Sequence, residues 1–286
     1  MANLRKPPWL KKKIPPFQDL QKIKSILTET ELHTVCEEAR CPNLGECFSQ
    51  GTATILILGR VCTRNCGFCA VEHGNPIAPD EAEPRHVAQA IEKMGLRYVV
   101  ITSVTRDDLP DGGASHFAKT IQAIRQMDRE IKVEVLVPDL KGDWDSLEGV
   151  LQEGPDVLNH NMETVRRLYA EVRPQADYER SLNLLKRSKE TYPHIRTKSG
   201  LMLGLGESRE EVLDLFQDLR KAKCDLLTIG QYLQPHTNRL PVVRYIQPEE
   251  FEAYRKIGED IGFKMVSSGP FVRSSFHASE MFDANI

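Results

Sequence analysis

A short apolar run followed by a cysteine-rich loop occupies residues 53–69, ATILILGRVCTRNCGFC. The run at 53–58 has the length and β-branched composition of a buried strand, and it stops at Gly59. Three cysteines follow, with three residues between the first two and two between the last two: Cys62, Cys66 and Cys69. We therefore predict a strand whose C-terminal end leads directly into three thiols.

The same alternation of apolar runs and amphipathic stretches continues toward the C-terminus. Further strands are predicted at 98–104, 132–137, 156–161, 197–203 and 226–233. Helices are predicted near 85–95, 114–128, 143–152, 177–191, 208–222 and 248–261. Strands separated by helices of this length form right-handed βαβ units. Because no strong dinucleotide-binding fingerprint follows the first strand, we predict an α/β fold with a partial or complete parallel (βα)6-type, TIM-like barrel.

The length of 286 residues allows one such domain with extensions. We predict an N-terminal extension over 1–50, the barrel domain over 51–262 and a C-terminal extension over 263–286. The composition, with 40% hydrophobic and 28% charged residues and a net charge of -3, is that of an ordinary soluble globular protein. It gives no reason to expect a nucleic-acid partner.

No apolar run is long enough to span a membrane, and the N-terminus lacks the apolar stretch of a secretory signal. We expect a cytoplasmic protein without a membrane partner. Residues 1–14 instead carry basic residues and prolines and no acidic residue. These charges form either a solvated tail or an arm that binds an acidic partner.

Seven cysteines, an odd number in a protein expected in the cytoplasm, argue against a disulfide framework. Cys224 stands alone and is expected to be a buried structural thiol. The other six form two triplets: the first is Cys36, Cys41 and Cys47, and the second is Cys62, Cys66 and Cys69. Thiolates in such triplets suit iron–sulfur clusters or zinc. In a barrel, reactive groups lie on the loops after the strands, where the second triplet falls. A four-iron cluster held by three cysteines leaves one iron open for a small molecule.

The loop Cys62-x3-Cys66-x2-Cys69, with Phe68 beside the last cysteine, resembles the signature of the radical S-adenosylmethionine (SAM) superfamily. The resemblance implies a 4Fe-4S cluster on these three cysteines, with SAM chelated by the open iron. Reductive cleavage of SAM then gives a 5'-deoxyadenosyl radical. An enzyme with radical chemistry is therefore expected.

Two further motifs together resemble those of the lipoyl synthase family: Cys36-x4-Cys41-x5-Cys47 before the barrel and Arg273-Ser274-Ser275 near the C-terminus. The resemblance implies an auxiliary 4Fe-4S cluster held by the three cysteines and by Ser275, which would be a releasable ligand. The family usually has tyrosine after the two serines. This chain has Phe276, which puts any role of that hydroxyl in doubt.

This resemblance implies a sulfurtransferase that inserts two sulfur atoms, at C6 and C8, into a protein-bound octanoyl-lysine group, with sulfide supplied by the auxiliary cluster. The implied substrates are octanoylated lipoyl carrier domains, in 2-oxoacid dehydrogenase E2 subunits and in the glycine cleavage H protein. Further implied partners are an electron donor, such as flavodoxin or ferredoxin, and proteins that repair iron–sulfur clusters.

Polar residues near the predicted strand ends are candidates for binding SAM. Asn159, Asn161 and Glu163 alternate along the fourth strand, so they are expected on one side, with His160 and Met162 on the other. They form either a polar pocket or a cap for the next helix. The full set of predicted SAM contacts is Phe68, Ser103, Asn161, Glu163, Lys198 and Met202.

Two further features, the loop at 105–113 and the charged side chain of Arg173, are open to more than one interpretation. The loop at 105–113 either contacts SAM or forms a turn and helix start. Arg173, like Lys198, could neutralise a carboxylate, although most such side chains are surface charges. Glycines in the stretch 200–207 would let a planar ligand approach the backbone.

Other functions remain possible at this point. A zinc-binding interaction module could use His33 with the first triplet and His73 with the second. Another radical enzyme, related to methylthiotransferases or biotin synthase, would keep the SAM chemistry. The barrel pattern, the wide spacing of the first triplet and the Arg-Ser-Ser motif favour the lipoyl synthase interpretation.

Overall fold

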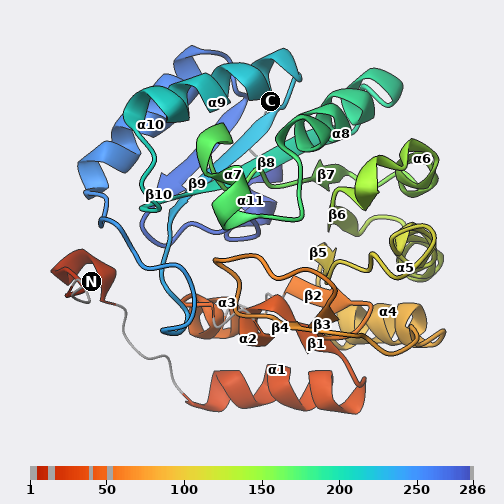
Figure 1. The fold of residues 1–286 in the computed structure, drawn as a ribbon. Helices are drawn as coiled ribbons and strands as arrows, with labels where there is room; N and C mark the ends of the chain where they lie inside the picture. Colours follow the sequence, from red (N-terminus) through yellow and green to blue (C-terminus); the bar gives the residue numbers. More distant parts are fainter. Residues whose placement is uncertain (1–4, 12–16, 39–40, 50–53, 284–286) are drawn as a thin grey trace. The chain divides into compact units, whose positions relative to one another are not determined.

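The computed structural model describes residues 5–11, 17–38, 41–49 and 54–283. Parallel strands alternate with helices along the chain (Figure 1). The chain divides into two compact units. The first unit contains Lys13–Arg64 and Val71–Leu158, and the second contains Met1–Lys12, Asn65–Ala70 and Asn159–Ile286.

Three parallel strands form the sheet of the first unit, in the order β2 (Thr54–Ile57), β5 (Tyr98–Ser103) and β6 (Lys132–Leu136). Every residue of β2 is buried, as expected for a parallel strand covered on both faces. The two-residue strand β1 (His33–Thr34) pairs antiparallel with β2.

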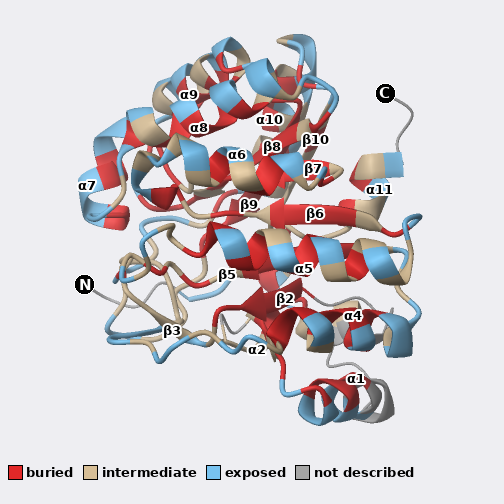
Figure 2. Ribbon diagram, turned by 90° about the vertical axis from the view of Figure 1, so that its right-hand side faces the viewer, coloured by how far each residue is buried: buried red, intermediate tan, exposed pale blue. Residues whose placement is uncertain are grey.

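Helices α4 (Glu83–Met94) and α5 (Ala114–Met127) lie side by side next to this sheet (Figure 2). The apolar stripe of each helix is buried, including Val87 and Ile91 in α4 and Phe117 in α5. Helices α1 (Phe17–Glu29) and α6 (Trp144–Gln152) also belong to this unit.

The second unit contains three further parallel strands, in the order β8 (Arg196–Leu203), β9 (Leu226–Gln231) and β10 (Met265–Gly269). Its main helices are α8 (Tyr178–Thr191), α9 (Arg209–Lys221) and α10 (Pro248–Asp260). A capping box between Ser208 and Glu211 fixes the start of α9. Phe216 packs edge-to-face on Phe263, with ring centroids 6.0 Å apart.

Several short elements connect these strands and helices. Strand β7 (Val157–Asn159) spans the boundary between the two units. The others are α2 (Val35–Glu38), α3 (Leu44–Ser49), β3 (Val61–Cys62), β4 (Glu72–His73), α7 (Tyr169–Val172), α11 (Ala278–Asp283) and the 3-10 turns Pro8–Leu10, Leu140–Gly142 and Arg166–Leu168.

All six predicted strands and all six predicted helices are present, with ends shifted by a few residues. Residue 53, the first of the first predicted strand, lies outside the described residues. The fourth predicted strand, 156–161, was too long: β7 ends at Asn159, and Glu163 has a left-handed φ of 67°. Strands β1 and β10 lie within the segments predicted as extensions, and the division into three parts stays a prediction.

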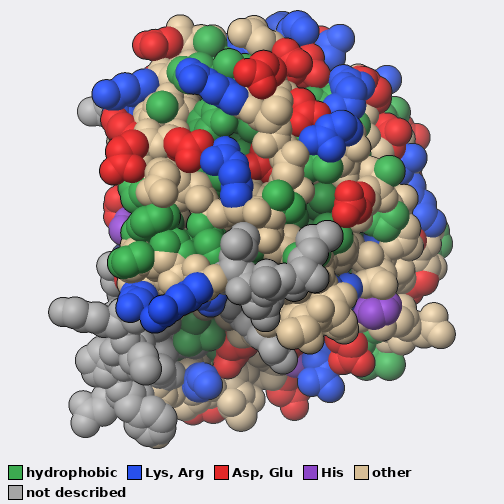
Figure 3. All heavy atoms as spheres, turned by 60° about the vertical axis from the view of Figure 1, so that its left-hand side comes forward, with side chains coloured by type: hydrophobic (Ala, Val, Ile, Leu, Met, Phe, Trp, Pro, Cys, Tyr) green, Lys and Arg blue, Asp and Glu red, His purple; other side chains and the backbone are tan. Residues whose placement is uncertain are grey.

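The surface shows mixed charge. Lys and Arg side chains are interspersed with Asp and Glu side chains on the face drawn in Figure 3. Of the basic N-terminal residues, Arg5, Lys6 and Lys11 are exposed, whereas Lys12 and Lys13 lie outside the described residues. Within the described ranges, no helix has the length and apolar character needed to cross a membrane.

Candidate functional site

The first cysteine triplet lies in a compact loop of the first unit. Cys36 is in α2, Cys41 begins the turn before α3, and Cys47 is in α3. The Cys41 N–H donates to the Cys36 carbonyl at 3.0 Å. Burial, with smaller contributions from Cys41 and Cys47, raises the pKa of the Cys36 thiol to about 12. Cys41 and Cys47 therefore lie near enough to Cys36 to affect the charge of its thiol, and the use of these three thiols as one set of cluster ligands stays a prediction.

The pKa of Cys36 gives a test on the metal-free protein. At pH 8 the buried thiol of Cys36 should react with iodoacetamide at least about tenfold more slowly than the half-buried Cys41, because only the thiolate is nucleophilic. Peptide mass spectrometry over time measures both rates. Cys224, fully buried in the core with its pKa also raised to about 12 by burial, is the unreactive reference. Equal rates at Cys36 and Cys41 would contradict the buried position of Cys36.

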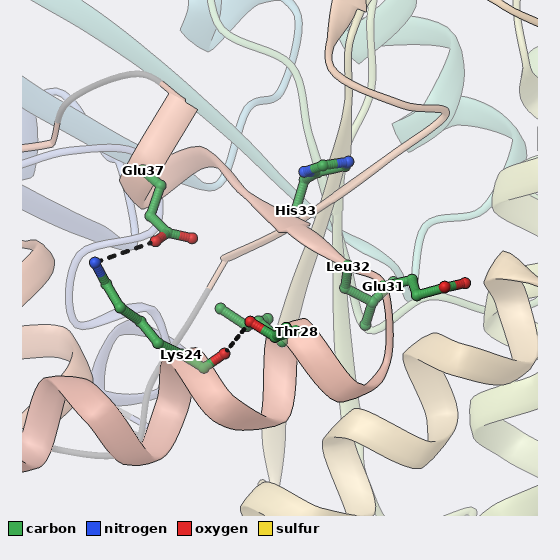
Figure 4. Close-up of a pocket in the computed structure, with 7 residues that line it drawn as sticks. Lys24, Thr28, Glu31, Leu32, His33 and Glu37 are labelled. Carbon is green, nitrogen blue, oxygen red and sulfur yellow. Dashed lines mark hydrogen bonds and ion pairs between the residues drawn. The ribbon is translucent and has the colours of Figure 1, made fainter.

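A surface pocket of about 410 Å³ lies beside this triplet, between α1 and the segment that leads to Cys36 (Figure 4). Two of its charged groups are paired with each other: Lys24 Nζ lies 3.7 Å from a Glu37 carboxylate oxygen. His33 Nδ1 lies 3.6 Å from a Glu38 carboxylate oxygen. None of the predicted cluster ligands or SAM contacts lines the pocket, but His33, the histidine of the zinc alternative, does. The full lining is Lys24, Leu27, Thr28, Glu31, Leu32, His33 and Glu37.

Cys62, the first cysteine of the second triplet, lies on β3 in the first unit. Its sulfur accepts the backbone N–H of Arg64 at 3.4 Å and of Thr105 at 3.3 Å. The carbonyl of Thr105 in turn accepts the N–H of Thr63 at 3.0 Å. The loop after β5 therefore supports the cysteine loop, and N–H groups directed at a cluster's sulfur ligands are one way in which a protein tunes the cluster's potential.

A buried ion network fixes the same loop from its other side. The Arg64 guanidinium donates to both carboxylate oxygens of Asp107, at 2.7 and 2.9 Å, and to Asp139 at 2.7 Å. Burial lowers the pKa of Arg64, but its hydrogen bonds to Asp107 and Asp139 outweigh this and raise it. Asp108 pairs with the buried Arg106 at 2.8 Å. The carboxylates of the 105–113 loop are thus engaged within the protein, which favours the structural interpretation of these residues.

This network predicts a large loss of stability when one partner is neutralised. Asp139→Asn should lower the free energy of unfolding of the metal-free protein by about 3–5 kcal/mol, because it removes one partner of a buried charge. Urea denaturation measures the change. Asp128→Asn, which weakens an ion pair to the exposed Arg97, is the matched control and should cost less than about 1 kcal/mol. Similar losses in the two variants would contradict the importance of the network.

Cys66, Phe68 and Cys69 belong to the second unit. Gly67 fixes their segment, because its N–H donates to the Val172 carbonyl and its carbonyl accepts the Leu240 N–H, both at 2.9 Å. A Cβ on Gly67 would lie 2.8 Å from the Leu240 side chain. Phe68 is partly buried against the hydrophobic core.

Asn161 and Glu163 lie together beyond the end of β7. The Asn161 side-chain amide donates to a Glu163 carboxylate oxygen at 2.9 Å. Burial raises the pKa of Glu163, whereas Arg173 and the Asn161 amide lower it. Arg173 donates to the Asn161 carbonyl at 2.7 Å, so it supports this segment. Met162 faces the hydrophobic core, whereas the predicted alternation over 159–163 required a strand that in the structure ends at Asn159.

The remaining predicted SAM contacts lie on two strands. Lys198 is fully buried on β8, contrary to the usual surface position of lysine. Met202, also on β8, is partly buried, and its N–H donates to the Glu163 carbonyl at 2.9 Å. Ser103 ends β5 in the first unit. Within the described residues, Ser103 Oγ and Asn161 Oδ1 are buried without a hydrogen-bond partner, which fits sites that receive a polar ligand.

Sequence reasoning missed a second group of buried charges, before the cysteine loop. Leu58 has a left-handed φ of 66°, a strained conformation for this residue. Its N–H donates to Glu83 at 2.7 Å, and its carbonyl accepts from Arg106 at 3.2 Å. His116 Nε2 lies 2.7 Å from the same Glu83 oxygen. These residues are far apart in the sequence, so no local pattern could have indicated them.

The predicted cluster ligands are distributed over the two units of the chain. Cys62 lies in the first unit and Cys66 and Cys69 in the second, as does the half-buried Ser275 between β10 and α11. Across the described residues, no three Cys, His, Asp or Glu side chains already surround one metal position. The cluster assignments accordingly depend on the cysteine spacing and on the family.

Comparison with known proteins establishes that family. The radical SAM superfamily matches residues 56–219, and the N-terminal domain of lipoyl synthase matches residues 1–41. A lipoyl synthase from Syntrophotalea carbinolica is 59% identical over 276 residues, which cover 96% of this chain and 89% of the relative. The chain belongs to the lipoyl synthase family. A second lipoyl synthase, from Caldanaerobacter subterraneus subsp. tengcongensis, is 56% identical and covers 96% of each chain.

Membership of the lipoyl synthase family confirms the prediction of a sulfur-inserting radical enzyme that uses SAM and 4Fe-4S clusters, two in this family. It decides against the zinc module and the other radical families. Solved structures confirm the fold class. SuiB of Streptococcus suis bound to SAM has a TM-score of 0.58 at 14% identity, covering 72% of this chain and 46% of SuiB. Methylornithine synthase has a TM-score of 0.54 at 12% identity, covering 90% and 79%.

Proposed function

We propose that this chain inserts two sulfur atoms, at C6 and C8, into an octanoyl group that is linked to a lysine of a lipoyl carrier protein. Membership of the lipoyl synthase family carries this proposal, together with the two cysteine triplets and the Arg-Ser-Ser motif in one chain. The positions that receive sulfur are unactivated C–H bonds. No acid, base or nucleophile among the side chains can break them, so a radical is needed.

One cluster would be bound by Cys62, Cys66 and Cys69. When bound, this cluster and SAM supply the 5'-deoxyadenosyl radical that removes a hydrogen atom from the octanoyl chain. The protein's contribution is to position these groups: the N–H groups of Arg64 and Thr105 point at the Cys62 sulfur. The Arg64–Asp107–Asp139 network holds the loop in place.

SAM would contact the predicted set Phe68, Ser103, Asn161, Glu163, Lys198 and Met202. Glu163 places a carboxylate in a half-buried position where it can accept hydrogen bonds or pair with a cationic group of SAM. The buried Lys198 can pair with the SAM carboxylate. The partnerless oxygens of Ser103 and Asn161 can accept or exchange hydrogen bonds with a polar ligand.

The auxiliary cluster, held by Cys36, Cys41, Cys47 and Ser275, would be the sulfur donor and is consumed in the reaction. An alkoxide ligand suits this use, because a hard oxygen binds iron of a thiolate cluster less well than a fourth cysteine. Ser275 would therefore hold one iron with a ligand that the chain can release, and the cluster, when bound, would supply the sulfide for the product. Each chain can make one product before the cluster is rebuilt.

The proposed partners are those that membership of the lipoyl synthase family implies. We expect the carrier to be an E2 subunit of a 2-oxoacid dehydrogenase or the glycine cleavage H protein, the reductant to be a flavodoxin or ferredoxin, and iron–sulfur repair proteins to restore the auxiliary cluster. We expect the proposed reaction to take place in the cytoplasm.

The function is tested with anaerobically purified protein, SAM, a strong reductant and an octanoylated carrier domain. The expected product is the dithiol form, in which two C–H bonds have become C–SH groups: the octanoyl group gains two sulfur atoms, and the hydrogen atom removed from each carbon is replaced by a proton on the added sulfur. About two molecules of 5'-deoxyadenosine should form per product, because each C–H bond requires its own radical. An unoctanoylated carrier domain is the control and should gain no sulfur. A protein that cleaves SAM and leaves the octanoyl group unchanged would refute the proposed substrate.

A further inference from the structure

The segment that precedes Ser275 lies directly on two glycines of the second unit. A Cβ added to Gly230 on β9 would come within 2.1 Å of the Val272 carbonyl oxygen. A Cβ added to Gly200 on β8 would lie 3.2 Å from Ser274 Oγ. The absence of side chains at these two positions therefore permits the segment to approach the strands closely. We call residues 272–274 in this position the seated segment.

Asn161 connects the seated segment to Glu163. Its carboxamide uses both N–H groups, one on a Glu163 carboxylate oxygen at 2.9 Å and one on Ser274 Oγ at 2.6 Å. Asn161 is only 8% exposed, and its Oδ1 is buried without a hydrogen-bond partner among the described residues. The orientation of the amide thus depends on the carboxylate and on the hydroxyl together.

Glu163, in contrast, is fixed by its backbone. Its N–H donates to the Gly200 carbonyl, and its carbonyl accepts the Met202 N–H, both at 2.9 Å. Glu163 is half-buried, and the positive charges of Arg173 and of Arg273, the residue before Ser274, stabilise the charged form of its carboxylate. A movement of the seated segment would therefore change both the hydrogen bonding and the electrostatic environment of a carboxylate that itself stays in place.

We propose that Asn161 is a positioning residue that couples the seated segment to SAM binding at Glu163. The inference rests on the roles proposed for Glu163 and Ser275. Seating of Ser274 orients the Asn161 amide, and the amide orients the Glu163 carboxylate toward SAM. By reciprocity, bound SAM strengthens seating of the segment by the same factor. The enzyme would thus hold the chain next to Ser275 in place during the part of the cycle in which a radical can form.

Ser274→Ala tests the coupling, because it removes the hydroxyl that Asn161 contacts and leaves Asn161, Glu163 and Ser275 unchanged. Two quantities are measured on anaerobically reconstituted protein: SAM affinity by equilibrium dialysis, and hydrogen–deuterium exchange of residues 270–278 with and without SAM. In the wild type, SAM should slow this exchange. In Ser274→Ala, SAM should bind about fivefold more weakly, the effect of one net hydrogen bond, and the protection of residues 270–278 should fall by a similar factor.

Gly230→Ala tests the same coupling without replacing any polar side chain, because its Cβ would displace the Val272 carbonyl. It should weaken SAM binding and increase exchange of the segment together, as Ser274→Ala does. Ser279→Ala, a serine substitution in α11 further along the same segment, is the matched control and should behave as wild type.

Wild-type SAM affinity in both Ser274→Ala and Gly230→Ala, or a change in exchange without a change in affinity, would overturn the coupling. Either result leaves the proposed function intact, because the wild type still binds and cleaves SAM. A wild-type protein that does not bind SAM would instead refute the proposed function. The two failures are therefore distinguishable in one set of measurements.

Discussion

Ser275→Cys should give a protein that contains a full complement of iron and cleaves SAM but makes almost no lipoyl product. A fourth thiolate is a better ligand for cluster iron than an alkoxide, so the auxiliary cluster should form at least as well as in the wild type. The iron that must leave after sulfur transfer is then held tightly. We expect the product yield to fall on the order of 100-fold, while 5'-deoxyadenosine is still formed.

Ser279→Cys is the matched control for this substitution. It introduces a thiol in α11, four residues after Ser275, and should retain the wild-type product yield. Iron content, 5'-deoxyadenosine and lipoyl product are measured on the same preparations. A wild-type yield of lipoyl product from Ser275→Cys would show that Ser275 is not the releasable ligand.

Replacement of Cys62, Cys66 and Cys69 together by alanine should remove the radical cluster and leave the auxiliary cluster in place. Iron should fall from about eight to about four per chain, because one cubane cluster is lost and the auxiliary cluster remains. Cleavage of SAM should fall to background, because the auxiliary cluster binds no SAM in the proposed scheme. Lipoyl product should disappear with it.

The complementary variant replaces Cys36, Cys41 and Cys47 by alanine. It should also contain about four irons, yet it should still cleave SAM without inserting sulfur. The two triple variants therefore have the same iron content and differ in the reaction that is lost. SAM cleavage by the Cys62/Cys66/Cys69 variant would contradict the assignment of the radical cluster.

The sequence predicts the fold well where the signal is local. The run at β2 is buried at every position, and the helix from Pro248 follows the expected pattern of a helix start. Strand β10 was missed because Met265–Gly269 contains two serines and a glycine, a composition that indicates a strand only when a neighbouring strand is already in place. The end of β7 was missed because Glu163 adopts a left-handed φ that nothing in its local sequence requires.

In the candidate site, too, the local sequence indicates some features, and others arise only from the fold. Cysteine spacing identifies the two triplets because cluster ligands come from short segments. The groups that hold these segments in place come from far along the chain: Arg64 binds Asp107 and Asp139, 43 and 75 residues away. The contact of Asn161 with Ser274 spans 113 residues. Such contacts depend on the packing of strands and loops, so residue type and spacing alone do not indicate them.

In the proposed reaction, this chain supplies the sulfur of the product from its own auxiliary cluster. The most direct measurement reconstitutes the clusters with isotopically labelled sulfide, removes free sulfide, and follows one turnover on an octanoylated carrier domain by mass spectrometry. We expect both sulfur atoms of the lipoyl group to carry the label, with at most about one product per chain. Unlabelled sulfur in the product, or many products per chain without repair proteins, would contradict the account.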